Sequence, residues 1–314
     1  MTAVAAPVPS LRSVPMPVLA AVVTVVLWAS AFVGIRAAGH DYPAGALALG
    51  RLLAASAVLT VVVGVRAARG RAPRLPRGRV LTGIVAWGAA WFGLYNLALN
   101  SAERHLDAGT TSLLVNVAPV LVAVLAGLLL GEGFPRRLVA GIGVALAGVV
   151  LITTATSAGR ADTAGVLLGL AAAVLYASSA VGQKRLLRHV DPLTATWLGC
   201  LAGTVVALPF APQLLTAAAA APASSTVTMV YLGVFPTAVA FLAWGYALSH
   251  TSAGRLAATT YAIPALVVAL SWLLLAEVPL PLALAGGALC LAGVGVATAP
   301  LPSRTSSVRR IPGA

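Results

Sequence analysis

Long apolar stretches recur along almost the whole chain, and they constrain its fold more than any other feature. A helix that crosses a membrane needs about 20 mainly apolar residues, because unpaired backbone groups are costly in hydrocarbon. Of the 314 residues, 60% are hydrophobic and only 9% are charged, which is too little polar surface for a soluble globule. We therefore expect an all-α membrane protein with ten transmembrane helices. Their predicted ranges are 17–37, 43–65, 79–101, 107–130, 136–156, 163–183, 192–212, 225–248, 253–275 and 280–299.

Basic residues lie mostly on one side of this predicted path. With the N-terminus inside, 16 of the 20 lysines and arginines fall in cytoplasmic segments, as the positive-inside rule requires. We expect a multi-pass protein of the cytoplasmic membrane with both termini in the cytoplasm. The arginines between residues 66 and 79 are interpreted as a topology determinant, with an anionic-lipid patch as the alternative. Arg12 before the first apolar run is also typical of a signal peptide, but the repeat described next favours a retained helix.

One phrase occurs twice in the sequence. VLWASAFVG, residues 26–34, returns as VLYASSAVG, residues 174–182, and six of the nine letters agree. The correspondence continues at a nearly constant offset, which four extra residues near SAERHLD reset. It includes the pairs Pro43 and Pro192, Phe92 and Phe241, and Glu132 and Glu277. A match that extends through five predicted helices indicates an internal duplication.

The two copies are expected at 17–156 and 163–299, between a cytoplasmic segment 1–16 and a basic cytoplasmic tail 300–314. Because five helices is an odd number, the second copy enters the membrane from the opposite side, and the copies are inverted repeats. Inverted repeats are a recurring construction of secondary transporters, with the substrate site near the membrane midplane. Exchanging the conformations of two similar halves converts an inward-open state into an outward-open state of similar energy.

Five short motifs stand in a fixed order along the chain: WASAFVG at 28–34, GR at 50–51, YNLAL at 95–99, LLLGE at 128–132 and GVALAGV at 143–149. In this order and spacing they resemble the EamA family of the drug/metabolite transporter (DMT) superfamily. The resemblance covers the chain from about Val18 to Thr298. It implies a ten-helix bundle of two inverted repeats that moves small metabolites, often amino acids or their derivatives, usually outward. The second copy departs from the pattern, with Cys200 opposite Arg51 and LLLAEVPLP in place of LLLGEGFP.

Arg51 is the strongest single candidate for substrate binding. It stands inside the second predicted helix, about eight residues or roughly 12 Å from the outer end. An ionised residue inside a membrane helix is costly, so it should face a cavity or a partner. Its guanidinium suits a carboxylate or phosphate on a substrate. The alternative is an arginine locked to helix carbonyls or extended outward to water.

Other candidate substrate-binding residues are polar or aromatic side chains within predicted helices: Trp28, Ser30, Tyr95, Asn96, Asn116, Tyr176, Ser179, Trp244 and Tyr261. The rings line a wet cavity, or mark the interface where they lie at a helix end. The two asparagines bond to a neighbouring helix or contact substrate. Candidate hinges and gates are Pro119 and Pro264, which each remove a backbone hydrogen bond, together with Glu132 and Glu277. The two glutamates are interpreted as capping or pairing residues, with gating or proton coupling as the alternative.

Signals for other functions are absent from the sequence. It contains no phosphate-binding GK[ST] loop, no histidine and glutamate cluster and no catalytic constellation, so we predict no enzyme activity, catalytic residue, metal or cofactor. Cys200 and Cys290 lie inside apolar segments and suggest neither a disulfide nor a metal site. Nucleic acid is not an expected partner, because the basic residues lie between apolar runs without aromatic interleaving. The expected partners are a small metabolite, membrane lipids and, through small-residue faces such as GIGVALAG, the other half or a second copy in a homodimer.

We therefore predict a secondary transporter that exports a small polar metabolite. The alternatives are a non-transporting scaffold or regulator, a passive channel, and a cation or drug exporter of the same superfamily. All seven acidic residues fall in loops or near predicted helix ends. A cation exporter should carry a carboxylate deep within a helix, so this distribution favours zwitterionic or anionic substrates.

Overall fold

Helices make up every regular element in the part of the chain that the computed structural model describes, which is residues 16–118, 120–121, 125, 136–157, 163–250, 256 and 259–298. The first half contains α1 (Met16–Ala38), α2 (Ala44–Ala68), α3 (Arg79–Gly88), η1 (Ala89–Leu94), α4 (Tyr95–Ala102), α5 (Ala108–Val115) and α7 (Arg136–Ser157). The second contains α8 (Thr163–Leu186), α9 (Pro192–Ala207), η2 (Leu208–Phe210), α10 (Ala211–Ala220), α11 (Ala223–Leu232), η3 (Gly233–Val239), α12 (Ala240–His250), η4 (Thr260–Ala262), α14 (Ile263–Leu275) and α15 (Pro281–Thr298). The predicted all-α class is confirmed over these ranges.

Six continuous helical runs in the described residues are long and apolar enough to cross a membrane: Met16–Ala38, Ala44–Ala68, Arg79–Ala102, Thr163–Leu186, Pro192–Ala220 and Ala223–His250. Three shorter apolar helices, Val139–Leu151, Ile263–Leu275 and Pro281–Gly293, lie within other predicted spans. The helix predicted to end at residue 212 continues through α10, which ends at Ala220. The predicted start at 253 lies outside the described residues, and η4 runs directly into α14. The predicted span 107–130 lies mostly outside the described residues after position 118.

Leucine and valine side chains point outward on many of these helices. Val61, Leu167, Val205 and Leu215 are each more than 60% exposed. An apolar exterior of this extent is unfavourable in water but is the expected surface of helices that face lipid. The chain is therefore a multi-pass membrane protein.

Two aspartates fix the starts of helices at their loops. Asp107 caps α5, accepting hydrogen bonds from the Thr110 backbone N–H at 2.8 Å and the Thr110 hydroxyl at 2.7 Å. Asp191 caps α9 through the backbone N–H groups of Leu193 and Thr194, both at 3.1 Å. A capping carboxylate satisfies backbone donors that the first helical turn leaves free. These two acidic side chains are thus committed to the ends of helices.

The third membrane-length helix of each half is interrupted by a π-helical segment. These segments are η1, between α3 and α4, and η3, between α11 and α12. π-helical turns are rare and occur frequently at functional sites. Pro236 lies inside η3, where its missing N–H disrupts the regular hydrogen-bond ladder. Each π segment packs against the second helix of the opposite half, η1 on α9 and η3 on α2.

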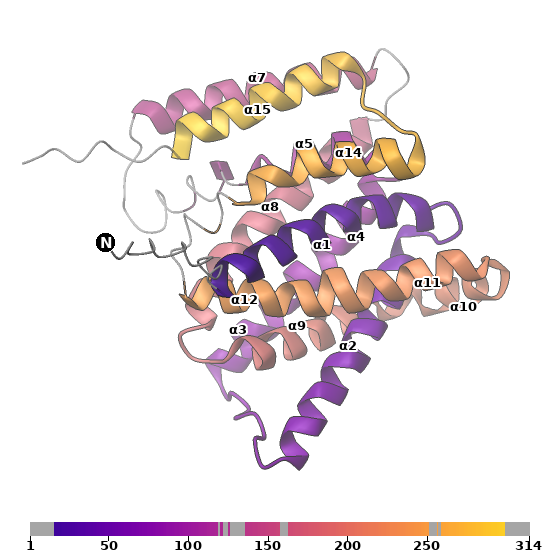
Figure 1. Cartoon of the computed structure of the whole chain (residues 1–314), viewed down its shortest axis with the longest axis vertical. Coiled ribbons are helices and arrows are strands. Elements are labelled where there is room, and N and C mark those ends of the chain that lie inside the picture. Colours follow the sequence, from indigo (N-terminus) through magenta and orange to yellow (C-terminus); the bar gives the residue numbers. More distant parts are fainter. Residues whose placement is uncertain are drawn as a thin grey trace, which may run out of the picture.

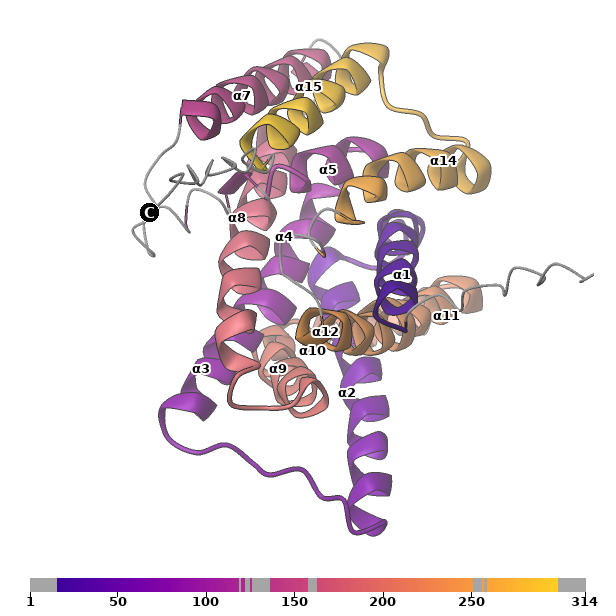
Figure 2. The ribbon, with the colours of Figure 1, turned by 60° about the vertical axis from the view of Figure 1, so that its left-hand side comes forward.

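The two halves pack on each other in reciprocal pairs. α1 packs on α12 while α8 packs on α4, and α1 packs on α14 while α8 packs on α5. Three helices pack on their own counterparts, in the pairs α2 with α9, α5 with α14 and α7 with α15. Figures 1 and 2 show α7 and α15 side by side at one edge of the molecule, next to the layer that contains α5 and α14. If each helix is replaced by its counterpart in the other half, the same set of helix pairs results.

Small residues allow the closest of these approaches. A Cβ atom added at Gly148 of α7 would lie 2.5 Å from the carbonyl oxygen of Gly286 in α15. Larger side chains would separate the two backbones. Small-residue faces allow the same close approach in other membrane helices. The small-residue faces predicted from the sequence are thus used between the halves.

Candidate substrate-binding site

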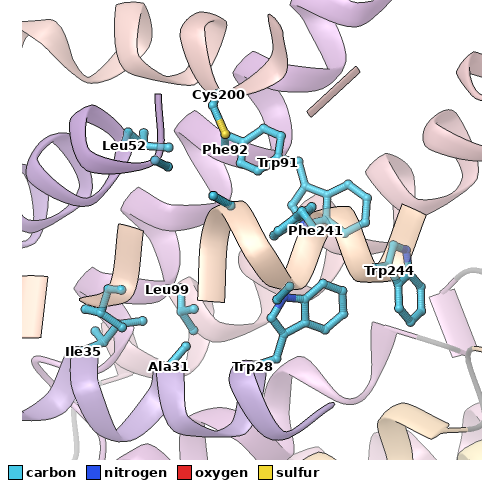
Figure 3. Packing of buried hydrophobic residues seen from close by; sticks show 14 of the residues in the cluster. Trp28, Ala31, Ile35, Leu52, Trp91, Phe92, Leu99, Cys200, Phe241 and Trp244 are labelled. Atoms are coloured by element: carbon cyan, nitrogen blue, oxygen red, sulfur yellow. The ribbon is translucent and has the colours of Figure 1, made fainter. Parts of the chain in front are cut away.

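Aromatic side chains from both halves meet in the middle of the bundle. The ring of Trp28 in α1 lies 5.0 Å from that of Trp244 and 5.3 Å from that of Phe241, both in α12. Its centroid is 6.2 Å from that of Tyr176 in α8, and Tyr176 is 6.4 Å from Tyr95 of α4. These are the distances of contacting rings. We call Trp28, Trp91, Phe92, Tyr95, Tyr176, Phe241 and Trp244 the aromatic cluster, and Figure 3 shows five of them together.

Two contacts in the aromatic cluster join residues that correspond in the repeat. Trp28 meets its counterpart Tyr176, and Phe92 meets its counterpart Phe241 with ring centroids 4.6 Å apart. Around a two-fold axis, a residue near the axis contacts its own equivalent. The aromatic cluster therefore lies where an axis relating the halves would pass. The structure brings four of the predicted candidates together here, and a role in substrate binding stays a prediction.

The polar atoms of this region are only partly satisfied. The indole N–H of Trp244 donates to Oε1 of Gln183 at 3.1 Å, and that of Trp87 donates to the carbonyl of Ser179 at 3.1 Å. The indole N–H of Trp28 and the hydroxyl of Ser179 are buried with no hydrogen-bond partner among the described residues. Buried polar groups are nearly always bonded in native proteins. Two polar groups beside the aromatic rings are thus without a hydrogen-bond partner in the described part of the chain.

Arg51 is buried between the halves and is 4% exposed. Its Nε and Nη2 atoms donate to the Thr237 hydroxyl at 3.3 and 3.0 Å, and that hydroxyl donates to the carbonyl of Leu232 at 2.8 Å. Arg51 therefore joins α2 to the π segment η3, rather than bonding to carbonyls of its own helix. Its Nη1 has no partner in the described part of the chain. One donor group of a buried cation remains free.

Glu103 is a buried acidic residue that the sequence analysis did not select. It directly follows α4 and is 2% exposed, and neither carboxylate oxygen has a hydrogen-bond partner within the described ranges. Burial raises the pKa of Glu103 well above its ordinary value, against the opposing positive charges of Arg36 and Arg51. Glu103 thus lies at a helix end, as the sequence analysis places all seven acidic residues, but this helix end is buried. A helix end is exposed only when nothing packs over it, and here other loops do.

Asn100 lies one turn before Glu103 and shares its situation. It is 2% exposed, its Nδ2 donates to the Ala44 carbonyl of α2 at 3.1 Å, and its Oδ1 has no partner among the residues described. The spacing of Asn96, Asn100 and Glu103 places all three on one helix face. That spacing, and the four extra residues near SAERHLD, are the sequence features from which this site could have been predicted.

Comparison with known proteins identifies the family. The model of the EamA-like transporter family matches the chain twice, over residues 15–154 and 163–299. The chain belongs to the EamA-like transporter family. The predicted resemblance is thus confirmed, and the protein is a transporter of a small molecule rather than an enzyme.

Several curated proteins resemble this EamA-like transporter over most of their length. The probable terminal-alkyne amino-acid exporter of Streptantibioticus cattleyicolor is 41% identical over 279 residues, which is 88% of this chain and 91% of the relative. The uncharacterized transporter YdfC of Bacillus subtilis is 34% identical over 85% of this chain and 86% of its own. The probable amino-acid metabolite efflux pump of Escherichia coli is 26% identical over 87% and 92%. A solved crystal structure at 22% identity matches with a TM-score of 0.61 over 90% of this chain and 96% of that chain, which shows a shared fold.

Polar side chains near the loops tie the two halves of the transporter together at one end. Arg36 of α1 forms an ion pair with Glu277, with Nε to Oε1 at 3.0 Å, and its Nη1 donates to the Glu103 carbonyl at 2.9 Å. The hydroxyls of Tyr42 and Thr226 are hydrogen-bonded at 2.7 Å, and Ser225 donates to the Asp41 carboxylate. We call these six residues (Arg36, Asp41, Tyr42, Ser225, Thr226 and Glu277) the outer tie. Glu277 is thus a paired residue, and its gating role stays a prediction.

Three other predicted site residues make separate hydrogen bonds. Ser30 shares a 2.7 Å hydrogen bond with Tyr231 of the second half. Asn96 and Asn116 donate to the carbonyls of Phe92 and Ser112 on their own helices, so the described hydrogen bonds differ from the predicted interhelical bonds.

The predicted hinge positions are only partly covered by the structure. Pro264 stands in the first turn of α14, directly after the 3₁₀ segment η4, and its role as a hinge stays a prediction. Tyr261 belongs to η4, but its side chain lies outside what the structure describes. Pro119 and Glu132 also lie outside the described residues.

Two cavities lie near opposite ends of α2. One, of about 220 Å³, is lined by Ile35, Arg36, Gly39, His40, Asn100, Glu103 and Arg104. The other, of about 350 Å³, is lined by residues that include Arg66, Arg71, Arg74, His189 and Asp191. The first cavity adjoins the outer tie, and Asn100 and Glu103 are among its lining residues.

Proposed function

We propose that this EamA-like transporter exports a small polar metabolite, an amino acid or a derivative of one, across the cytoplasmic membrane by alternating access. The free Nη1 of Arg51 carries the proposal, because a buried guanidinium between the halves can donate a charge-assisted hydrogen bond to a substrate carboxylate. The aromatic cluster supplies an adjoining wall for the rest of the molecule. The relatives that are named as amino-acid exporters or efflux pumps support both the substrate class and the direction.

The proposed architecture is ten transmembrane helices in two inverted five-helix repeats, at 17–156 and 163–299. The reciprocal helix pairs, the double family match and the contacts between repeat-related aromatic residues support it. The basic loops support an orientation with segment 1–16 and tail 300–314 in the cytoplasm. In that orientation the outer tie faces away from the cytoplasm, and the described conformation is closed on the outside. Export then requires the outer tie to break.

Counterflow in vesicles tests the proposed function. The purified full-length chain is reconstituted in lipid vesicles loaded with a mixture of the twenty standard L-amino acids, and uptake of labelled external amino acids is followed by mass spectrometry. We expect saturable exchange of at least one amino acid, and its loss in Arg51→Ala. A scaffold shows no exchange, and a passive channel shows flux without saturation; either result contradicts the proposal.

A second candidate function, export of an organic cation, is favoured by one observation. The buried carboxylate of Glu103 has the chemistry that a membrane exporter uses to exchange protons for cations. The same vesicles test this candidate with ethidium in place of the amino acids. Ethidium exchange that survives Arg51→Ala but not Glu103→Gln supports cation export, whereas amino-acid exchange that requires Arg51 supports the first proposal.

A further inference from the structure

Half of the buried polar atoms that lack a partner in the described residues belong to α2 and to the end of α4. Within the described ranges, Nη1 of Arg51, Oδ1 of Asn100 and both carboxylate oxygens of Glu103 make no hydrogen bond. The three residues are 4%, 2% and 2% exposed. An unsatisfied buried polar group destabilises a fold, so several of them on two neighbouring helices require an explanation in terms of function.

The local geometry places Asn100 and Glu103 beside a cavity, with Arg51 two helical turns beyond Ala44 on the same face of α2. The Nδ2 of Asn100 bonds to the Ala44 carbonyl at 3.1 Å, which holds this face of α4 against α2, the helix that carries Arg51. Asn100 and Glu103 line the cavity of about 220 Å³ next to the outer tie. The charges of Arg51 and Glu103 also act on each other electrostatically. A ligand that extends from this cavity along α2 would meet the carboxyl group of Glu103 and the buried guanidinium of Arg51.

The charges around Glu103 leave one negative group without a partner. The charges of Arg36 and Arg51 favour the ionised carboxylate of Glu103, whereas those of Asp107 and Glu277 oppose it. Glu277 is paired with Arg36, and Asp107 is bonded to the first turn of α5. Glu103 has no hydrogen-bonded partner in the described residues.

The other charged groups near the cavity do not supply a partner for Glu103. Arg104, on the cavity wall, donates to the carbonyls of Gly39 and Tyr42 at 3.1 and 3.5 Å. His40 also lines this cavity, and no described hydrogen bond joins it to Glu103. Among the described residues, no cationic group donates a hydrogen bond to the carboxylate oxygens of Glu103.

We propose that Glu103 binds the ammonium group of a zwitterionic amino acid whose carboxylate is bound by Arg51. The inference rests on the proposed function, and it assigns a binding residue to the positively charged group of the substrate. An amino acid carries both charged groups on one carbon, so one substrate head can bridge the two side chains. The ammonium has three donors, which suit the two oxygens of Glu103 and the Oδ1 of Asn100. Glu103 then selects amino acids over carboxylic acids that lack an amine.

Comparison of amino acids with their 2-hydroxy analogues tests this inference. Vesicles with the full-length chain are given equal mixtures of L-alanine, L-valine, L-leucine and L-phenylalanine and of the four corresponding 2-hydroxy acids. The wild type is expected to exchange the amino acids at least about tenfold faster, since a charge-assisted hydrogen bond is lost with the amine. Glu103→Gln is expected to abolish this preference while it keeps 2-hydroxy acid exchange, because the amide can still bond to a hydroxyl. Glu103→Asp is expected to keep the preference at a reduced rate.

Glu277→Gln is the matched control, since it removes a neighbouring carboxylate that is already paired. It is expected to change the exchange of both mixtures by the same factor. Retention of the wild-type ratio in Glu103→Gln overturns the inference, and so does loss of amino-acid exchange without any 2-hydroxy acid exchange. Loss of the preference in Glu103→Asp also overturns it. A wild type that exchanges none of the twenty standard amino acids contradicts the proposed function itself, which is a distinct result.

Discussion

The two halves of the chain differ in chemistry far more than in packing. Their helices pack in reciprocal pairs, and repeat-related rings contact each other at the centre. The charged groups are not reciprocal. Arg51 in the first half corresponds to Cys200 in the second, and both are buried. Glu103 lies in the segment where the first copy has four extra residues. A symmetric scaffold can exchange two conformations of similar energy, whereas a substrate with one charged end needs its binding groups on one side only.

Among the changes that test this difference between the halves, Arg51→Ala is expected to have the largest effect on transport. It removes a buried cation whose free Nη1 is proposed to bind the substrate carboxylate, so transport should fall by about 10- to 100-fold. Cys200→Ala, at the corresponding position, is expected to alter transport by less than about twofold, because a buried thiol offers only a weak hydrogen bond. Initial rates of vesicle exchange measure both. Equal losses for the two variants would show that the halves contribute alike.

Two glycines test whether the packing is as reciprocal as the contacts indicate. A Cβ atom at Gly88 would lie 2.5 Å from Cα of Gly199, and one at Gly233 would lie 2.3 Å from the carbonyl oxygen of Arg51. Backbone atoms cannot move aside easily, so Gly88→Ala and Gly233→Ala should each cost about 1–3 kcal/mol of stability. Thermal unfolding in detergent measures the change. Gly64→Ala is the control, since a Cβ there meets nothing within 4 Å. A loss in only one of the two variants would contradict reciprocal packing.

The pH dependence of stability tests Glu103, whose carboxyl group has no counterpart in the second half. The pKa of Glu103 is raised in the folded protein, so the folded state binds this proton more tightly than the unfolded state. Stability therefore falls as the pH rises from the ordinary glutamate pKa, about 4.3, up to the raised value. The melting temperature of the wild type should decrease more steeply over this window than that of Glu103→Gln. Parallel curves for the two proteins would mean that Glu103 does not titrate differently on folding.

The ion pair of the outer tie is expected to give the smallest effect. Arg36 and Glu277 are 25% and 27% exposed, so water screens their attraction. A double-mutant cycle with Arg36→Ala and Glu277→Gln should show a coupling of about 0.2–1 kcal/mol in thermal unfolding. Lys184→Ala, which removes the cation corresponding to Arg36 in the second half, should show no coupling with Glu277→Gln. Coupling of similar size in both cycles would indicate a general charge effect.

The sequence predicted the helices and Arg51 because these depend on local composition. A run of about 20 apolar residues is sufficient reason for a membrane helix, and a single arginine within one is conspicuous. The repeated phrase also placed Trp28 and Tyr176 at equivalent positions before their contact was seen. Glu103 was missed, because its burial depends on residues that are distant in sequence. Thr237 and Gln183 were missed for the same reason, since neither stands out by composition within its helix.

The sequence by itself determined that the chain is helical, that its two copies correspond, and that a cation lies inside the second helix. Only the tertiary structure decided which polar atoms are satisfied. Arg51 is held by Thr237, 186 residues away, and Arg36 is held by Glu277, 241 residues away. Helix formation is governed by neighbours along the chain, whereas the burial of a polar side chain is governed by whatever packs over it. The atoms left unpaired at Arg51, Asn100 and Glu103 are therefore a property of the assembled halves.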